Sequence, residues 1–177
     1  MKSIVEKYSY LVLIAGVIIG LDQWTKNLVR THLVLGETWL PDWLAWLSPY
    51  ARIVNWYNTG AAFGMFQNGS MVFRVLAIIV ICAIIYYFPR VDQSDWTLRL
   101  AMSMQLAGAF GNLIDRLTQA GKVTDFISVG TFPVFNVADA SISVGTVILL
   151  LGVYLQEQAA RKVKAMEITQ SGEATGE

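Results

Sequence analysis

Residues 71–88 read MVFRVLAIIVICAIIYYF, an apolar run that is interrupted only by Arg74 in its first turn. A helix of this length spans the hydrocarbon core of a bilayer, which is about 30 Å thick. Arg74 lies close enough to the end of the run for its side chain to reach the membrane interface. Pro89 follows directly and stops the helix. We therefore predict a transmembrane helix over residues 71–88.

Three further apolar segments repeat this pattern, at about residues 10–29, 98–114 and 137–156. The whole chain is 55% hydrophobic and 15% charged, with a mean hydropathy of +0.49, which is more apolar than a typical soluble domain. The sequence therefore predicts an all-α integral membrane protein with four transmembrane helices. Within 98–114, small residues such as Ala107 and Gly111 recur every four positions, which predicts a close contact between helices.

Two long connections join these helices. The segment 31–70 is rich in Trp and Tyr, which concentrate at membrane–water interfaces, so we expect it at the headgroups with a short strand at 53–57. The run 123–127 reads as a half-buried extended segment. We predict one membrane domain over 1–160, with a small β-containing segment on one side, followed by a polar, disordered tail over 161–177.

The orientation follows from the distribution of positive charge. Four spans place both termini on one side of the membrane, and Lys and Arg are slightly more numerous there. The short 89–97 loop and the basic stretch after the fourth helix lie on the same side. Because positively charged loops stay in the cytoplasm, we expect cytoplasmic termini and place the two long connections on the outer side of the membrane.

Composition also argues against several functions. The formal net charge is zero, so no overall field attracts nucleic acid. Cys82 is the only cysteine, which excludes an internal disulfide, and His32 is the only histidine. A single histidine argues against an HExxH zinc site and against Ser–His catalysis. We expect neither a metal nor a cofactor.

The ionisable and amide residues fall at the ends of the predicted spans. Asp22 and Lys26 are four residues apart, so they share a helix face and are expected to form a structural ion pair. Asn112 and Asp115 share a face at the end of the third span. Arg116, which follows them, is able to pair with a carboxylate or a lipid phosphate.

Two further aspartates approach the same membrane face from separate elements. Asp125 lies between apolar neighbours in the extended segment, and Asp139 lies three residues after Asn136, a candidate N-cap of the fourth helix. Asp139 alone would be explained by the helix dipole. Together the two are the groups needed for an aspartate dyad that shares one proton and activates water. A proton or cation pathway built on aspartates is the competing interpretation.

Five motifs in order resemble the bacterial lipoprotein signal peptidase (signal peptidase II) family. Their order, spacing and hydropathy match the family from about residue 10 to 156, with only small departures such as Thr124 and Ala140. The motifs are Asp22-Gln23-Trp24-Thr25-Lys26, Tyr57-Asn58-Thr59-Gly60-Ala61-Ala62-Phe63, Gly111-Asn112-Leu113-Ile114-Asp115-Arg116, Val123-Thr124-Asp125-Phe126 and Phe135-Asn136-Val137-Ala138-Asp139.

The resemblance implies an aspartic endopeptidase of the bacterial cytoplasmic (inner) membrane, with its active site toward the periplasmic face. Such an enzyme removes the signal peptide from diacylglyceryl-modified prolipoproteins, cutting just before the lipidated cysteine. Its partners would be these substrates and membrane lipids. By motif, Asp125 and Asp139 match the catalytic pair. The residues that match substrate-binding or site-supporting positions are Asn58, Gly60, Asn112, Asp115, Arg116, Asn136, Asp22 and Lys26.

Three other functions compete with this one. A small proton or ion transporter would use Asp22, Asp115, Asp125 and Asp139, but these residues cluster at span ends instead of crossing the bilayer. A membrane scaffold would use the small-residue stripe and would leave the polar motifs unexplained. A different intramembrane aspartic protease would usually place both aspartates inside helices, whereas Asp125 lies outside a predicted span.

Overall fold

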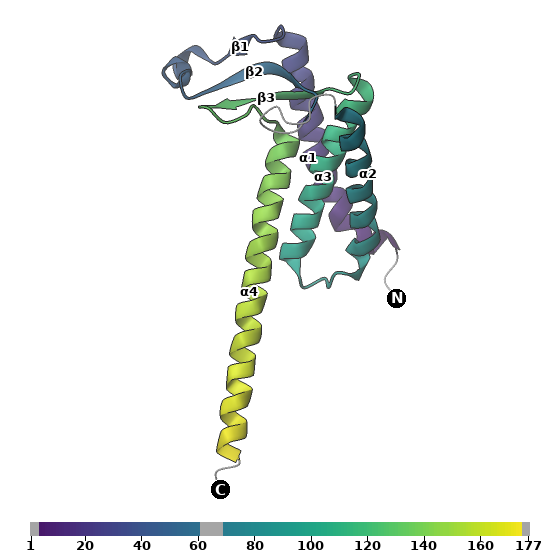
Figure 1. The fold of residues 1–177 in the computed structure, drawn as a ribbon, viewed down its shortest axis with the longest axis vertical. Coiled ribbons are helices and arrows are strands. Elements are labelled where there is room, and N and C mark those ends of the chain that lie inside the picture. The colour runs from purple at the N-terminus through teal and green to yellow at the C-terminus, as the bar shows by residue number, and fades with distance from the viewer. Residues whose placement is uncertain (1–3, 61–68, 175–177) are drawn as a thin grey trace.

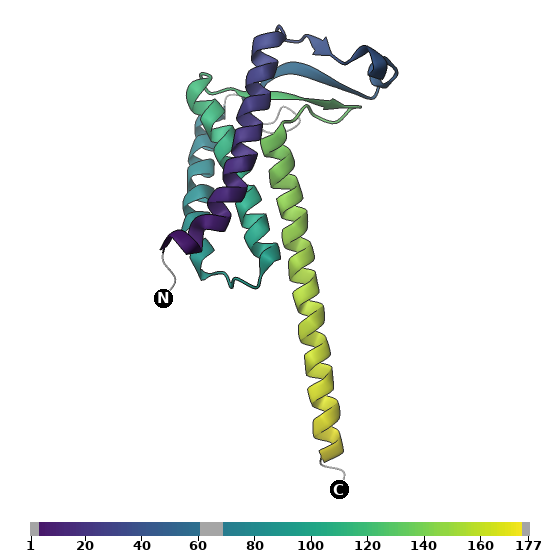
Figure 2. The same ribbon diagram turned by 180° about the vertical axis from the view of Figure 1, so that it is seen from behind.

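Four long helices and a small sheet make up the computed structural model, which describes residues 4–60 and 69–174. The helices are α1 (Ile4–His32), α2 (Ser70–Tyr87), α3 (Trp96–Thr118) and α4 (Val137–Ala174). All four predicted helices are confirmed as helices, and α1, α3 and α4 are longer than predicted. In Figures 1 and 2, α3 lies between the other three helices and packs against each of them.

Local sequence fixes several helix ends. α2 ends at Tyr87, and Pro89 lies in the short 3-10 helix η3 (Phe88–Arg90) that follows, as predicted. The side chain of Asp95 caps α3, because its Oδ1 accepts a hydrogen bond of 3.0 Å from the backbone N–H of Leu98. The chain between these two helix ends is the short connection from α2 to α3.

The sheet has three antiparallel strands in the order β1 (Thr38–Trp39), β2 (Ala51–Asn58) and β3 (Val123–Val129). The extended segments predicted at 53–57 and 123–127 are therefore confirmed and lie paired in one sheet. The 3-10 helix η1 (Asp42–Leu47) connects β1 to β2. Figures 1 and 2 show the sheet across one end of the helices, with the start of α1 and the α2–α3 connection at the other end.

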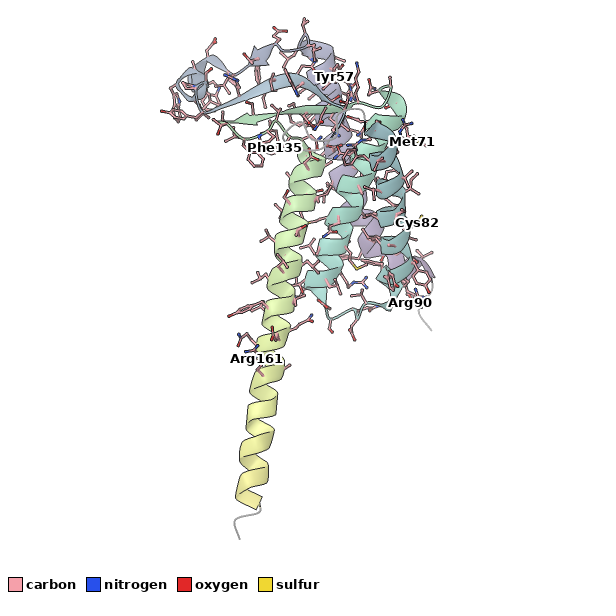
Figure 3. All side chains as sticks on the ribbon, viewed as in Figure 1. Tyr57, Met71, Cys82, Arg90, Phe135 and Arg161 are labelled. Atoms are coloured by element: carbon pink, nitrogen blue, oxygen red, sulfur yellow. The ribbon has the colours of Figure 1, made fainter. Side chains whose placement is uncertain are left out.

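The chain returns beside β3 before it enters α4. Phe135 forms an isolated bridge with Ile127, and its carbonyl oxygen accepts hydrogen bonds from the backbone N–H groups of Phe126 and Ile127. Figure 3 shows Phe135 where the underside of the sheet meets the head of α4. This return places Asn136 and the first turn of α4 directly against the strand that carries Asp125.

The helices expose apolar side chains and bury polar ones. Ile79 on α2 is 57% exposed and Val147 on α4 is 64% exposed, whereas Asp22, Lys26 and Asp115 are fully buried. Such a distribution suits a lipid environment. Within the described parts of the chain, two segments, those at 70–90 and 137–158, are long and apolar enough to cross a membrane. The crossing of all four helices stays a prediction.

The small residues of α3 are sites of close packing. A methyl group added at Gly108 would lie 2.4 Å from the carbonyl oxygen of Ala138 and 2.4 Å from Ile142, both on α4. One added at Gly111 would lie 2.6 Å from the carboxylate of Asp22 on α1. The predicted small-residue contact face is therefore confirmed, and it holds both α4 and α1 close to α3.

The C-terminal segment differs from its prediction. The sequence predicts a disordered tail from residue 161, whereas α4 continues as a helix to Ala174. The residues around position 160 are mainly Gln, Glu, Ala, Arg and Lys, which are strong helix formers. Glu157 and Arg161 also form an ion pair one turn apart, at 2.6 Å. Figure 3 shows Arg161 beyond the level of Arg90, where the other helices end.

Candidate active site

Asp125 is held in the middle of β3 between hydrogen-bond donors from two sides. Its side chain is 1% exposed. Asn58, at the end of the paired strand β2, donates from Nδ2 to Oδ2 of Asp125 at 3.1 Å. On the other side, Asn136 donates from Nδ2 to Oδ1 at 2.7 Å. Both carboxylate oxygens are thus positioned by amides from neighbouring segments.

Asp139 lies in the first turn of α4, where Asn136 is the N-cap, as predicted. The backbone N–H of Asp139 donates to Oδ1 of Asn136 at 2.9 Å, and the backbone N–H of Asn136 donates to Oδ2 of Asp139 at 3.3 Å. This reciprocal pair is a capping box. Asn112 on α3 donates from Nδ2 to Oδ1 of Asp139 at 2.7 Å.

Asn136 joins the two aspartates into one cluster. The same Nδ2 group that donates to Asp125 also lies 3.1 Å from Oδ1 of Asn112, the residue that contacts Asp139. β3, α3 and α4 therefore bring together the two carboxylates that spacing had placed on one membrane face. Burial, followed by the negative charge of Asp139, raises the pKa of Asp125 to about 7, although the hydrogen bonds from Asn58 and Asn136 act in the opposite direction.

A buried ion cluster, formed by Asp22, Lys26 and Asp115, contacts this site through Asn112. Lys26 Nζ lies 2.9 Å from Asp22 and 3.4 Å from Asp115, and it donates to Oδ1 of Asn112 at 3.0 Å. Asp22 also accepts a hydrogen bond of 2.9 Å from the backbone N–H of Ala138 on α4. The predicted Asp22–Lys26 pair is confirmed as part of a larger cluster that ties α1 to α3 and α4.

Three members of this cluster were missed by the sequence analysis. Arg30 contacts Asp115 at 3.4 Å and donates to the Thr124 hydroxyl at 3.1 Å. The backbone N–H of Thr124 donates to Asp115 at 2.9 Å, and Gln23 Nε2 contacts Asp115 at 3.2 Å. A sequence signal existed for Arg30, which lies one turn after Lys26 on the same helix face. Gln23 and Thr124 lie inside two of the quoted motifs, but no spacing along one helix connects them to Asp115.

A cavity of about 470 Å³ opens beside the two aspartates. Polar residues line it together with apolar residues from the β3–α4 return and from α4. The lining residues include Asn58, Gly60, Asn112, Arg116, Asp125 and Asp139, and the apolar ones include Phe132, Val134, Phe135, Ile142 and Val144. The shape and composition suit a substrate that brings a peptide bond and apolar side chains.

Arg116 lines this cavity, and not all of its N–H donors are used in hydrogen bonds to the described residues. Its Nη2 group donates to the carbonyl oxygen of Gly60 at 3.5 Å, and its guanidinium lies 5.2 Å from the ring centre of Phe73. Among the residues that the structure describes, its Nε has no hydrogen-bond partner. The rest of the predicted motif after Gly60, which begins at residue 61, lies outside the described residues.

Known proteins resemble this chain over most of its length. The family model for signal peptidase (SPase) II matches residues 14–155. A lipoprotein signal peptidase of Halalkalibacterium halodurans is 37% identical over 156 residues, covering 86% of this chain and 96% of that protein. One of Enterococcus faecalis is 35% identical, covering 86% and 92%. A solved bacterial membrane enzyme aligns with a TM-score of 0.75 at 30% identity, covering 86% of this chain and 90% of its own.

Proposed function

The chain belongs to the signal peptidase II family, and from this premise we propose that Asp125 and Asp139 are its catalytic pair. The family consists of membrane aspartic peptidases that remove signal peptides from prolipoproteins. The transporter alternative has no support from the family matches, which are to peptidases. The observation that carries our proposal is the pair of carboxylates, from separate elements, that share Asn136 as a neighbour and line the same cavity.

The mechanism uses one water molecule and two carboxylates, of which one is protonated. We propose that Asp139 is ionised and takes a proton from the water molecule. The oxygen atom of the water bonds at the same time to the carbonyl carbon of the peptide. Asp125 donates its proton to the carbonyl oxygen. As the carbon–nitrogen bond breaks, Asp139 gives the proton that it took from the water to the leaving amine. Asp125 takes back a proton from a hydroxyl group on the same carbon, so both carboxylates return to their starting states. This chemistry needs no metal.

The surroundings of each carboxylate support this division of roles. The pKa of Asp125 is raised to about 7, which suits a proton donor near neutral pH. Asp139 lies in the first turn of α4, where the aligned N–H groups of the helix stabilise a negative charge. The two groups titrate as a coupled pair, so the roles refer to the preferred site of a single shared proton.

The other motif residues bind the substrate or hold the pair in place. Arg116 and Asn58 line the cavity, so we assign them to the polar groups of the substrate backbone, with Gly60 as the close neighbour of both. Asp22 and Asp115 belong to the buried cluster that fixes α1, α3 and β3 around the site. We propose a diacylglyceryl-modified prolipoprotein as the substrate, cut just before its lipidated cysteine.

We place the site at the outer, periplasmic face of the bacterial inner membrane. All four helices are proposed to cross the membrane, which leaves both termini in the cytoplasm. Residues 1–160 then form the membrane domain, and the helical extension of α4 projects from it into the cytoplasm. The lengths of the four helices and their exposed apolar side chains support this arrangement.

A cleavage assay with purified protein tests the proposal. Wild type is mixed with a prolipoprotein that does or does not carry the diacylglyceryl group, and the product is identified by mass spectrometry. We expect cleavage of the lipidated form before the modified cysteine, and no product from Asp125→Asn or Asp139→Asn. Asp92→Asn, an exposed carboxylate in the α2–α3 connection, is the matched control and should cleave normally. Substantial activity in either site variant would refute the assignment of the pair.

A further inference from the structure

Three asparagine side chains surround the two aspartates, and the oxygen of each amide accepts from a group that can only donate. Oδ1 of Asn58 accepts from the backbone N–H of Gly60 at 2.9 Å. Oδ1 of Asn136 accepts from the backbone N–H of Asp139 at 2.9 Å. Oδ1 of Asn112 accepts from the ammonium group of Lys26 at 3.0 Å. An N–H or ammonium donor has no lone pair to offer, so it fixes which end of the amide faces it.

The opposite end of each amide therefore faces a carboxylate. The NH₂ groups of Asn58 and Asn136 donate to Asp125 at 3.1 Å and 2.7 Å, and that of Asn112 donates to Asp139 at 2.7 Å. If the Asn112 amide turned over, its oxygen would face a carboxylate oxygen at hydrogen-bond distance, and the two acceptors would repel. The orientation of Asn112 thus decides whether Asp139 has a donor or a repelling neighbour.

Of the three groups that hold these amides, one belongs to a side chain. From this geometry we infer that Lys26 is a positioning residue, which acts through Asn112 to hold the Asp139 carboxylate in its reactive placement. The inference rests on the proposed catalytic role of Asp139. It assigns to Lys26 a task beyond neutralising Asp22 and Asp115, the carboxylates with which it forms ion pairs.

Burial makes this hydrogen bond effective. Lys26 is fully buried and Asn112 nearly so, so water does not compete for the amide oxygen and the bond is strong in its low-dielectric surroundings. Nδ2 of Asn136 also lies 3.1 Å from Oδ1 of Asn112 and reinforces the same orientation. Lys26 therefore connects α1, through α3, to the first turn of α4.

The first test measures kcat and KM for Lys26→Met, which keeps the length of the side chain and removes its donors. We expect kcat to fall about 10- to 100-fold, as for a misplaced catalytic group, while KM stays within about twofold. In an Asn112→Ala background, Lys26→Met should lower kcat no further, because its route to Asp139 is already absent. Additive losses in the double variant would overturn the inference.

Because Lys26→Met leaves the buried Asp22 without its ion-pair partner and leaves Asp115 with Arg30 alone, a second pair of variants keeps the test independent of folding. Asp22→Asn removes one carboxylate and keeps the Lys26–Asn112 contact, and Asp22→Asn with Lys26→Met removes both charges of the pair. We expect the second variant to have the lower kcat at equal folded amount, measured by size exclusion and thermal unfolding. Equal kcat values would contradict a positioning role. If no Lys26 variant folds, Asn112→Ala alone must lower kcat at unchanged KM, and a wild-type kcat would overturn the inference.

Gln23→Leu is the matched control for damage to the buried cluster. Gln23 contacts Asp22 at 3.1 Å and Asp115 at 3.2 Å but does not donate to Asn112. We expect a lower unfolding temperature and a loss of kcat clearly smaller than that of Lys26→Met. A kcat loss equal to that of Lys26→Met would show that cluster integrity alone matters, against the inference. Activity in Asp139→Asn would instead refute the catalytic pair, so the two failures are distinguishable.

Discussion

Asp125 is a buried carboxyl group whose pKa is raised to about 7, so its proton is lost near neutral pH. Burial is the main cause, and the charge of Asp139 is the second. Unfolding exposes Asp125 and returns its pKa to the ordinary value of 3.8. Between these two values the folded protein holds a proton that the unfolded chain releases, so stability falls as pH rises from about 4 to about 7.

The raised pKa of Asp125 predicts the basic limb of the pH–rate profile. If Asp125 is the proton donor, kcat/KM should fall above about pH 7 as the proton is lost. The hydrogen bond from Asn58 stabilises the ionised form and lowers the pKa. Asn58→Ala should therefore move the basic limb to higher pH, by up to about one unit. The measurement is the cleavage rate from pH 5 to 10.

Asn55→Ala is the control for this prediction. Asn55 lies on the same strand, but its side chain donates to the carbonyl oxygen of Leu33 at 2.8 Å, away from Asp125. Its substitution should leave the basic limb in place even if stability falls. A limb that moves equally in both variants, or that moves to lower pH in Asn58→Ala, would contradict Asp125 as the donor.

For single residues, the sequence predicted which side chains belong to the site better than it predicted which of them are in contact. The ion pair of Asp22 with Lys26 and the cap formed by Asn136 follow from spacing within one helix, and both are confirmed. The contacts of Arg30 with Asp115 and Thr124 join three elements, so no local spacing encodes them. The order of motifs indicated that these segments act together, and tertiary packing determines which atoms meet.

The head of α4 combines two functions in one residue, and two substitutions separate them. Asn136 caps the helix through Oδ1 and donates to Asp125 through Nδ2. Asn136→Ser keeps a capping oxygen but loses the amide donor, whereas Asn136→Ala loses both. Loss of the cap alone costs about 1 kcal/mol. We expect both variants to lose most activity, with Asn136→Ala the less stable of the two by about that amount.

Cleavage rate and the temperature of unfolding in detergent check this prediction. The unfolding temperatures of Asn136→Ser and Asn136→Ala should differ in the stated order, while both rates stay far below wild type. A Ser variant with near-normal activity would mean that the cap, and not the amide donor, is what the reaction needs from Asn136.

The packing of α3 predicts a second contrast between two glycines. Gly108 has the backbone of Ala138 and the side chain of Ile142 where a Cβ would stand, whereas Gly16 on α1 has open space there. Gly108→Ala must push α4 away from α3, which costs about 1–3 kcal/mol and displaces Asp139. Gly16→Ala should raise helix stability by about 0.5–1 kcal/mol.

Thermal unfolding and cleavage of the two variants provide the test. Gly108→Ala should unfold at a lower temperature and cleave more slowly, and Gly16→Ala should match or exceed wild type in both. If Gly108→Ala were as stable and active as Gly16→Ala, the close approach of α3 and α4 would be wrong.

Helices and strands were predicted well where the pattern of apolar residues was clear or where a proline marked the end of a helix. Pro89 ended α2, and the runs at 53–57 and 123–127 became strands. The strand β1 has only two residues and was not predicted, because so short a segment has no alternation to detect. The helical extension of α4 was missed because polar composition was taken as disorder, although its residues favour helix.

The connectivity of the whole molecule constrains how it sits in a membrane. β2 precedes α2 and β3 follows α3, yet the two strands pair in one sheet. If α2 crosses the bilayer, α3 must cross back, because otherwise the paired strands would lie on opposite sides. α2 is long and apolar enough to cross, so this argument supports a crossing by α3, whose polar residues face inward.

The same argument extends to the ends of the chain and gives a prediction for topology. The head of α4 lies against β3, so a crossing by α4 puts Arg161 on the side opposite the sheet. With Cys82 replaced by Ser, single cysteines are introduced at Trp43 in η1, Asp92 in the α2–α3 connection and Arg161. A membrane-impermeant maleimide should label Trp43→Cys in intact spheroplasts, and Asp92→Cys and Arg161→Cys only after lysis.

Two crossings, by α2 and α4 alone, would leave Arg161→Cys on the same side as Trp43→Cys. Labelling of Arg161→Cys in intact spheroplasts would therefore rule out the four-helix arrangement, and with it a site that faces the periplasm above cytoplasmic termini.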